Sequence, residues 1–143
     1  MQAVSDGARW MVRLVEGERL PDVFVEFARA HGIRAAAVPM GIGQLTQVRL
    51  AFWNGTEYVP REIPTPVELV SLSGSIGEAE GEPSVHLHAT VGLADHSTVG
   101  GHLVSGTVGL LVESLVETFP GRAFPRPFDE SVGLRRLELG GTG

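Results

Sequence analysis

The sequence predicts an α+β domain in which a mainly antiparallel sheet of about six or seven strands carries one clear amphipathic helix. Two observations lead to this fold class. One segment alone has the 3.6-residue apolar repeat of a helix, whereas the other apolar runs are short and bounded by glycine, proline or Asn-Gly. The connections between those runs are mostly too short for the crossovers of a parallel sheet.

Length and composition favour one domain over residues 1–143, with a peripheral C-terminal tail of about residues 120–143. A chain of 143 residues with 43% hydrophobic content is long enough to bury a core without metal or disulfide support. The sequence has no cysteine and no lysine, and its formal charge is −6. Thiolate chemistry is therefore excluded, and direct binding of nucleic acid is disfavoured. No segment is typical of a signal peptide or a membrane span, so we expect a cytoplasmic protein.

The first elements are a strand at residues 9–15 and a helix that follows it. The helix is predicted by apolar residues that repeat with i, i+3, i+4 spacing. Pro21 suits its first turn and Asp22 its positive end, and Gly32 stands where the helix should stop. Its apolar positions are Leu20, Val23, Phe24, Phe27 and Ala28.

Strands are then predicted at residues 33–40, 46–53 and 56–63. Gly41 and Gly43 follow the first of these, and they indicate tight packing or a bulge more than a contact with a ligand. Asn54-Gly55 separates the other two, which predicts a hairpin.

A second hairpin is predicted between residues 67–76 and 85–94, on either side of the acidic turn GEAEGEP. Residues 107–119 could form a strand or a helix, and the β-branched residues favour a strand. Three prolines follow Phe119 in the tail.

Four of the five histidines lie between His86 and His102. Residues i and i+2 of a strand project from one face with Cα atoms about 6.6 Å apart, so His86 and His88 should point the same way. A third histidine would complete the ligand set of an open zinc site. The alternative is that alternating histidines are only exposed polar positions of a strand.

The third ligand could be His102 or His96. A hairpin closed over residues 95–98 would pair His102 with about Val91, roughly 10 Å from His88 along the strand. His102 would then need Gly100-Gly101 to loop back, or the third ring would come from a neighbouring subunit. His96 is expected in the turn, and His31 is expected to interact with the C-terminal dipole of the helix.

Several motifs occur in an order that resembles the plant and prokaryote conserved domain family, the PPC domain, in its stand-alone prokaryotic form. They are GERLPDVFVEFARAHGIRAAAV, GIGQL, VELVSLSGSI, GEPSVHLHATVGLAD and VGGHLVSGTV. The resemblance implies a homotrimer in which His86, His88 and His102 bind a metal, and zinc suits neutral imidazoles. Plant members add a basic AT-hook peptide that binds DNA, and this sequence contains no such peptide.

The resulting hypothesis is a homotrimeric metal-binding domain with a small-molecule ligand or a metal-assisted enzymatic role. Catalytic residues are not identified: Asp95 and Glu113 are the carboxylates considered for moving protons beside the metal, and neither is assigned this role. The main alternative is a DNA-associated or regulatory protein-interaction module. A purely structural oligomerisation domain would have no ligand.

Overall fold

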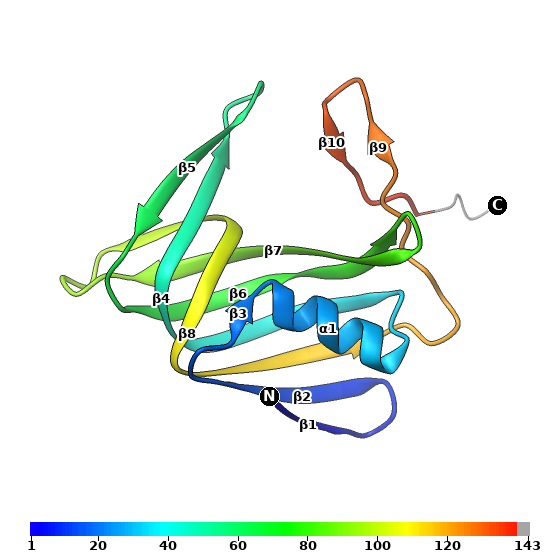
Figure 1. Ribbon diagram of the computed structural model, residues 1–143, viewed down its shortest axis with the longest axis horizontal. Helices are drawn as coiled ribbons and strands as arrows, with labels where there is room; N and C mark the ends of the chain where they lie inside the picture. The colour runs from blue at the N-terminus through cyan, green and yellow to red at the C-terminus, as the bar shows by residue number, and fades with distance from the viewer. Residues whose placement is uncertain (140–143) are drawn as a thin grey trace.

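Residues 1–139, which the computed structural model describes, form a predominantly antiparallel sheet with a single helix lying on it (Figure 1). The α+β fold class is therefore as predicted, but the main sheet has eight strands, more than the six or seven expected. The elements, in chain order, are β1 (Gln2–Ser5), β2 (Arg9–Val15), β3 (Arg19–Leu20), α1 (Asp22–His31), β4 (Ala36–Trp53), β5 (Tyr58–Ile63), β6 (Val67–Ala79), β7 (Glu82–Gly92), β8 (Thr98–Thr118), β9 (Phe128–Asp129) and β10 (Leu134–Arg135).

The strands that sequence reasoning missed are short. β1 is exposed along its whole length, and β3, β9 and β10 have two residues each. Such segments carry no apolar alternation, so the sequence gives no signal for them. β9 and β10 pair with each other and form a small hairpin apart from the main sheet.

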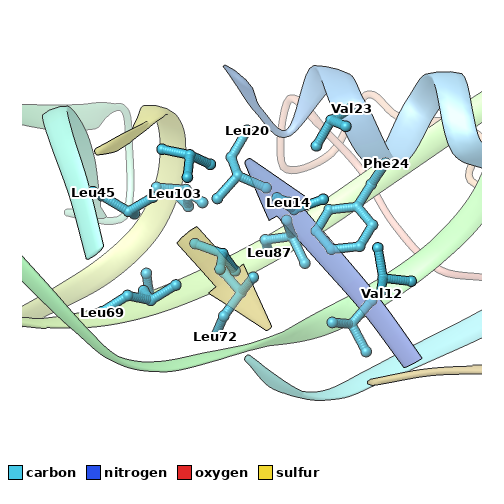
Figure 2. Close-up of a cluster of buried hydrophobic side chains, with 14 of the residues drawn as sticks. Val12, Leu14, Leu20, Val23, Phe24, Leu45, Leu69, Leu72, Leu87 and Leu103 are labelled. Carbon is cyan, nitrogen blue, oxygen red and sulfur yellow. The ribbon is translucent and has the colours of Figure 1, made fainter. Parts of the chain in front are cut away.

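Helix α1 confirms the predicted apolar repeat from Val23 to Ala28, whereas Leu20, which was also assigned to it, lies in β3. Pro21 is its N-cap, and Gly32 ends it in the left-handed conformation with φ 62°, which glycine adopts without steric cost. The buried face of the helix lies over the sheet, and its side chains meet those of the strands in one core (Figure 2). The residues labelled there are Val12, Leu14, Leu20, Val23, Phe24, Leu45, Leu69, Leu72, Leu87 and Leu103.

Strand β4 joins two segments that were predicted as separate strands, 33–40 and 46–53. It runs through the two glycines and pairs with β6 and β8, with several register shifts along β8. A Cβ atom at Gly43 would lie 2.1 Å from the carbonyl oxygen of Leu111. Gly43 therefore allows close packing of two backbones, and Gly41 allows close packing against the Leu72 side chain, in agreement with the predicted tight packing.

The two predicted hairpins are confirmed, and of residues 107–119, the strand-or-helix segment, all but Phe119 belong to strand β8. β4 pairs with β5 around Asn54-Gly55, and β6 pairs with β7 around Glu80-Gly81. β7 also pairs with β8, and β8 pairs with β4. Because β4 pairs with β6 as well, the strands β4, β6, β7 and β8 form a closed ring of pairings.

Among the described residues, no helix has the length and apolar character needed to cross a membrane.

Candidate metal centre

The β7–β8 hairpin brings His86, His88 and His102 together. His88 and His102 are directly opposite each other in the register, and His86 lies two residues from His88 on the same face. One ring nitrogen of each histidine lies within 4.8 Å of the others. The ring centroids are 5.2 Å apart for His86 and His88, 5.1 Å for His86 and His102, and 5.6 Å for His88 and His102.

This register corrects the expected hairpin. Gly92 pairs with Thr98, and the Leu93 N–H donates to the Ser97 carbonyl at 2.8 Å, so the turn comes earlier in the chain than residues 95–98. Val91 consequently pairs with Val99 and not with His102. The three histidines meet within one chain, without a backbone loop and without a ring from a neighbouring subunit.

The glycines before His102 have a different role from the one expected. A Cβ atom at Gly101 would lie 2.7 Å from the Ala51 carbonyl oxygen. Gly101 thus lets β4 approach β8 beside His102, whose register partner on β4 is Ala51. The remaining histidines lie elsewhere: His96 is in the hairpin turn with φ 66°, and His31 ends α1 and packs against Trp10 and Phe27.

The environment of His86 and His102 fits a metal ion. Burial is the main cause that lowers the pKa of His86 to about 4, and the positive charge of Arg126 adds to it. Burial also lowers the pKa of His102, together with His88. Both rings are therefore neutral at pH 7, as metal ligands must be. Nδ1 of His102 is buried without a hydrogen-bond partner among the described residues, and a metal ion would satisfy such a nitrogen.

A pocket of about 670 Å³ adjoins the histidines. His86 and His102 line it, whereas His88 is exposed beside it. Figure 1 shows the β4–β5 and β9–β10 hairpins rising on either side of this region, and both contribute lining residues. Tyr58 stacks on the His102 ring with centroids 5.0 Å apart. The other lining residues are Trp53, Ser75, Ser84, Val85, Arg126, Val132, Leu134, Arg135, Arg136 and Leu137.

Arg126 from the tail lies next to the histidines. Its guanidinium donates to Ser75 Oγ at 2.6 Å, and Ser75 is the register partner of His86 on β6. The residue is only 5% exposed. Its Nε has no hydrogen-bond partner in the described part of the chain. Sequence reasoning missed this arginine because only its flanking prolines mark it, and no spacing links it to the histidines.

The two carboxylates named from the sequence do not line the pocket. Asp95 accepts hydrogen bonds from Ser97 within the turn of the β7–β8 hairpin. Glu113 is eleven positions along β8 from His102 and pairs there with Arg13. Neither can serve as a proton donor or acceptor at the histidine cluster in this arrangement.

Solved structures with the same fold include two that resemble this chain over almost its full length. A plant- and prokaryote-conserved (PPC) protein of Pyrococcus horikoshii is 30% identical, with a TM-score of 0.87 and coverage of 95% of this chain and 94% of that one. A metal-containing protein of Archaeoglobus fulgidus is 32% identical, with a TM-score of 0.85 and coverage of 93% and 94%.

A curated relative, the bifunctional protein GlmU of Synechococcus sp. (strain JA-2-3B'a(2-13)), is 30% identical over 131 residues. The match covers 90% of this chain but only 20% of that protein, so the chain spans about a fifth of the length of this relative. The family model of the Plants and Prokaryotes Conserved (PCC) domain matches residues 1–120, and the chain belongs to this family.

Proposed function

We propose that this protein binds a divalent metal ion, zinc, through His86, His88 and His102, and holds a small molecule in the pocket beside it. One observation carries the proposal: one nitrogen from each of the three rings lies within 4.8 Å of the others. Tetrahedral zinc with Zn–N bonds of about 2.0–2.1 Å needs nitrogens about 3.4 Å apart. Small rotations of the three side chains would close the difference.

Zinc is the metal that the ligand chemistry favours. Three neutral imidazoles without sulfur ligands are typical of an open zinc site, in which a fourth position is left for water or a ligand. The Archaeoglobus fulgidus relative is named a metal-containing protein, which supports a metal in this fold. When bound, zinc would supply a Lewis acid that polarises a ligand oxygen.

The residues around the cluster favour binding and polarisation of a ligand over proton transfer. Tyr58, Ser75 and Ser84 line the pocket and carry hydroxyls that can orient a polar ligand, and no carboxylate is among its lining residues in the described part of the chain. A metal-assisted reaction would therefore have to use a hydroxyl, a histidine or bound water to move a proton.

Direct binding of DNA is less well supported. The chain carries a charge of −6 and no lysine. Most of its arginines pair with carboxylates, including Arg9 with Asp6 and Arg34 with Glu78. A surface of this kind offers few cations to phosphates.

The proposal predicts about one zinc ion per chain, as expected for a three-histidine site. Elemental mass spectrometry would be run on untagged protein after dialysis against zinc and then against metal-free buffer. We expect His86→Ala and His102→Ala to lose the metal, because two imidazoles do not hold zinc in this buffer. His96→Ala is the matched control, since it removes a histidine from the turn of the same hairpin.

Circular dichroism would establish that each variant is folded. Wild-type protein without zinc after this loading would refute the proposal. Equal loss of zinc in His96→Ala would also count against it, because the loss would then not depend on the cluster.

A further inference from the structure

Arg126 is a buried positive charge without a carboxylate partner in the described part of the chain. The residue is 5% exposed, and within residues 1–139 the one hydrogen bond of its side chain goes to the neutral Ser75 hydroxyl. Buried charges in proteins are usually paired, because an unpaired one loses its hydration without compensation. The two other arginines of the pocket differ in this respect: Arg135 pairs with Glu80 and Arg136 with Asp129.

Arg126 also borders a second pocket, lined among others by Glu78, Glu80 and Glu138, but the pocket beside the histidines adds no negative charge. Among the described residues that line the pocket are three arginines and two histidines, and none is acidic. A zinc ion on three neutral rings would bring two more positive charges to the same region. A pocket lined by positive charge of this kind attracts an anion.

We propose that the pocket binds a small organic carboxylate whose anionic group pairs with Arg126. The guanidinium is held by Ser75, directly across the β6–β7 ladder from His86, so an anion on Arg126 would lie beside the histidine cluster. Arginine suits this role because its planar fork matches the two oxygens of a carboxylate. The inference places its ligand beside the proposed metal, but the contact with Arg126 does not depend on that metal.

The rest of the pocket selects an organic body over inorganic phosphate. Its lining includes the aromatic residues Trp53 and Tyr58 and the aliphatic residues Val132, Leu134 and Leu137. A volume of about 670 Å³ is within the usual range for small-molecule sites. Apolar and aromatic walls around one unpaired cation fit a monoanion with an aromatic or aliphatic body.

Benzoate and benzamide are suitable probes, since they have nearly the same shape and differ in charge. Each would be titrated into isotope-labelled protein, with and without zinc, while NMR follows the pocket residues and the Arg126 Nε–H signal. We expect benzoate to bind at least about ten-fold more tightly than benzamide, because only benzoate pairs with the buried charge. Inorganic phosphate is the third probe and should bind more weakly than benzoate.

Arg126→Met should weaken benzoate binding about ten-fold or more, whereas Arg126→Lys should retain part of it. Arg136→Met is the matched control: it removes an arginine that lines the same pocket but already pairs with Asp129, and benzoate affinity should hardly change. Zinc content should be the same in all three variants, so a failure of the metal proposal would be seen separately.

Equal affinities for benzoate and benzamide would overturn the inference. Unchanged benzoate affinity in Arg126→Met would overturn it as well. Tighter binding of phosphate than of benzoate would show that the site takes an inorganic anion.

Discussion

Two glycines beside the histidine cluster have no room for a side chain. A Cβ atom at Gly74 would lie 1.9 Å from the His86 carbonyl oxygen, and one at Gly101 would lie 2.7 Å from the Ala51 carbonyl oxygen. Both values are well below an ordinary van der Waals contact. The motifs LSGSI and GGH therefore reflect close packing of β6 against β7 and of β4 against β8, which fixes the backbones that carry the ligands.

At the residue scale, Gly101→Ala should weaken zinc binding and lower the free energy of unfolding. The added methyl group would push β4 away from β8 next to His102, and overpacking of this kind costs about 1–3 kcal/mol. Urea unfolding and zinc titration would measure the two effects. Gly92→Ala is the control, because its Cβ atom would meet Val70 at an ordinary 3.4 Å.

A Gly101→Ala variant with wild-type stability and zinc affinity would show that β4 is not held as closely in solution. A loss of stability with unchanged zinc affinity would separate strand packing from the geometry of the ligands.

At the element scale, the tail is anchored at the end of β6. Glu78 donates its N–H to the Phe124 carbonyl at 2.9 Å and accepts from the Arg126 N–H at 2.8 Å, and Phe124 donates to the Arg34 carbonyl at 3.0 Å. The side chains of Arg34 and Glu78 also form a bidentate ion pair. The position of Arg126 in the pocket thus depends on β6 as well as on the tail.

The ion pair gives a pH-dependent prediction. Hydrogen bonding and charge from Arg34 lower the pKa of Glu78 below its ordinary value of 4.5. A carboxyl group of this kind stabilises the fold above pH 4.5, and the contribution is lost as the pH falls through the lower, folded-state pKa. In Arg34→Gln we expect the pKa of Glu78 to return toward 4.5, and we expect the variant to be less stable than wild type at pH 7 but not at low pH.

NMR titration of the Glu78 carboxyl carbon would measure this pKa, and thermal unfolding at each pH would measure stability. Arg29→Gln is the matched control, since Arg29 pairs with Glu82 and not with Glu78. An unaltered Glu78 titration in Arg34→Gln would mean that the pair does not form in solution.

The elements differ in how far the sequence predicts them. Helix α1 and the hairpin at Asn54-Gly55 follow from local signals, a 3.6-residue repeat and a turn dipeptide, and both are confirmed. The register of β7 and β8 does not follow from a local signal, because the polar residues DHST suggested a turn over residues 95–98. The residue types of a strand indicate which side chains share a face, but the length of the turn decides which residues of the two strands pair.

At the scale of the whole molecule, the fold class could be predicted and the closed ring of strands could not. The pairing of β4 with β8 joins segments far apart in sequence, such as Ala37 with Glu117, and no local pattern specifies such a contact. The same holds for the candidate site. The histidines could be named from their spacing, whereas Arg126 reaches them only through long-range docking of the tail.

The outer face of the sheet supports a prediction about assembly. Met11, Leu115 and Met40 lie in one row across β2, β8 and β4, on the face that does not pack against the core. Met11 is 42% exposed and Met40 is 38% exposed, and Ile42 two positions further along β4 is also exposed. Contiguous exposed apolar side chains of this kind mark protein interfaces.

We therefore propose that this face is an interface between copies of the chain in the homotrimer that the family resemblance implies. Light scattering after gel filtration should give three times the chain mass of 15.2 kDa. Met40→Asp should give a lower mass, because a carboxylate buried in an apolar interface without a partner loses its hydration. Glu26→Lys is the control, since it changes the charge on the exposed side of α1, and it should leave the mass unchanged. A wild-type protein with the mass of one chain would refute the trimer. A Met40→Asp protein that keeps the trimer mass would place the interface on another face.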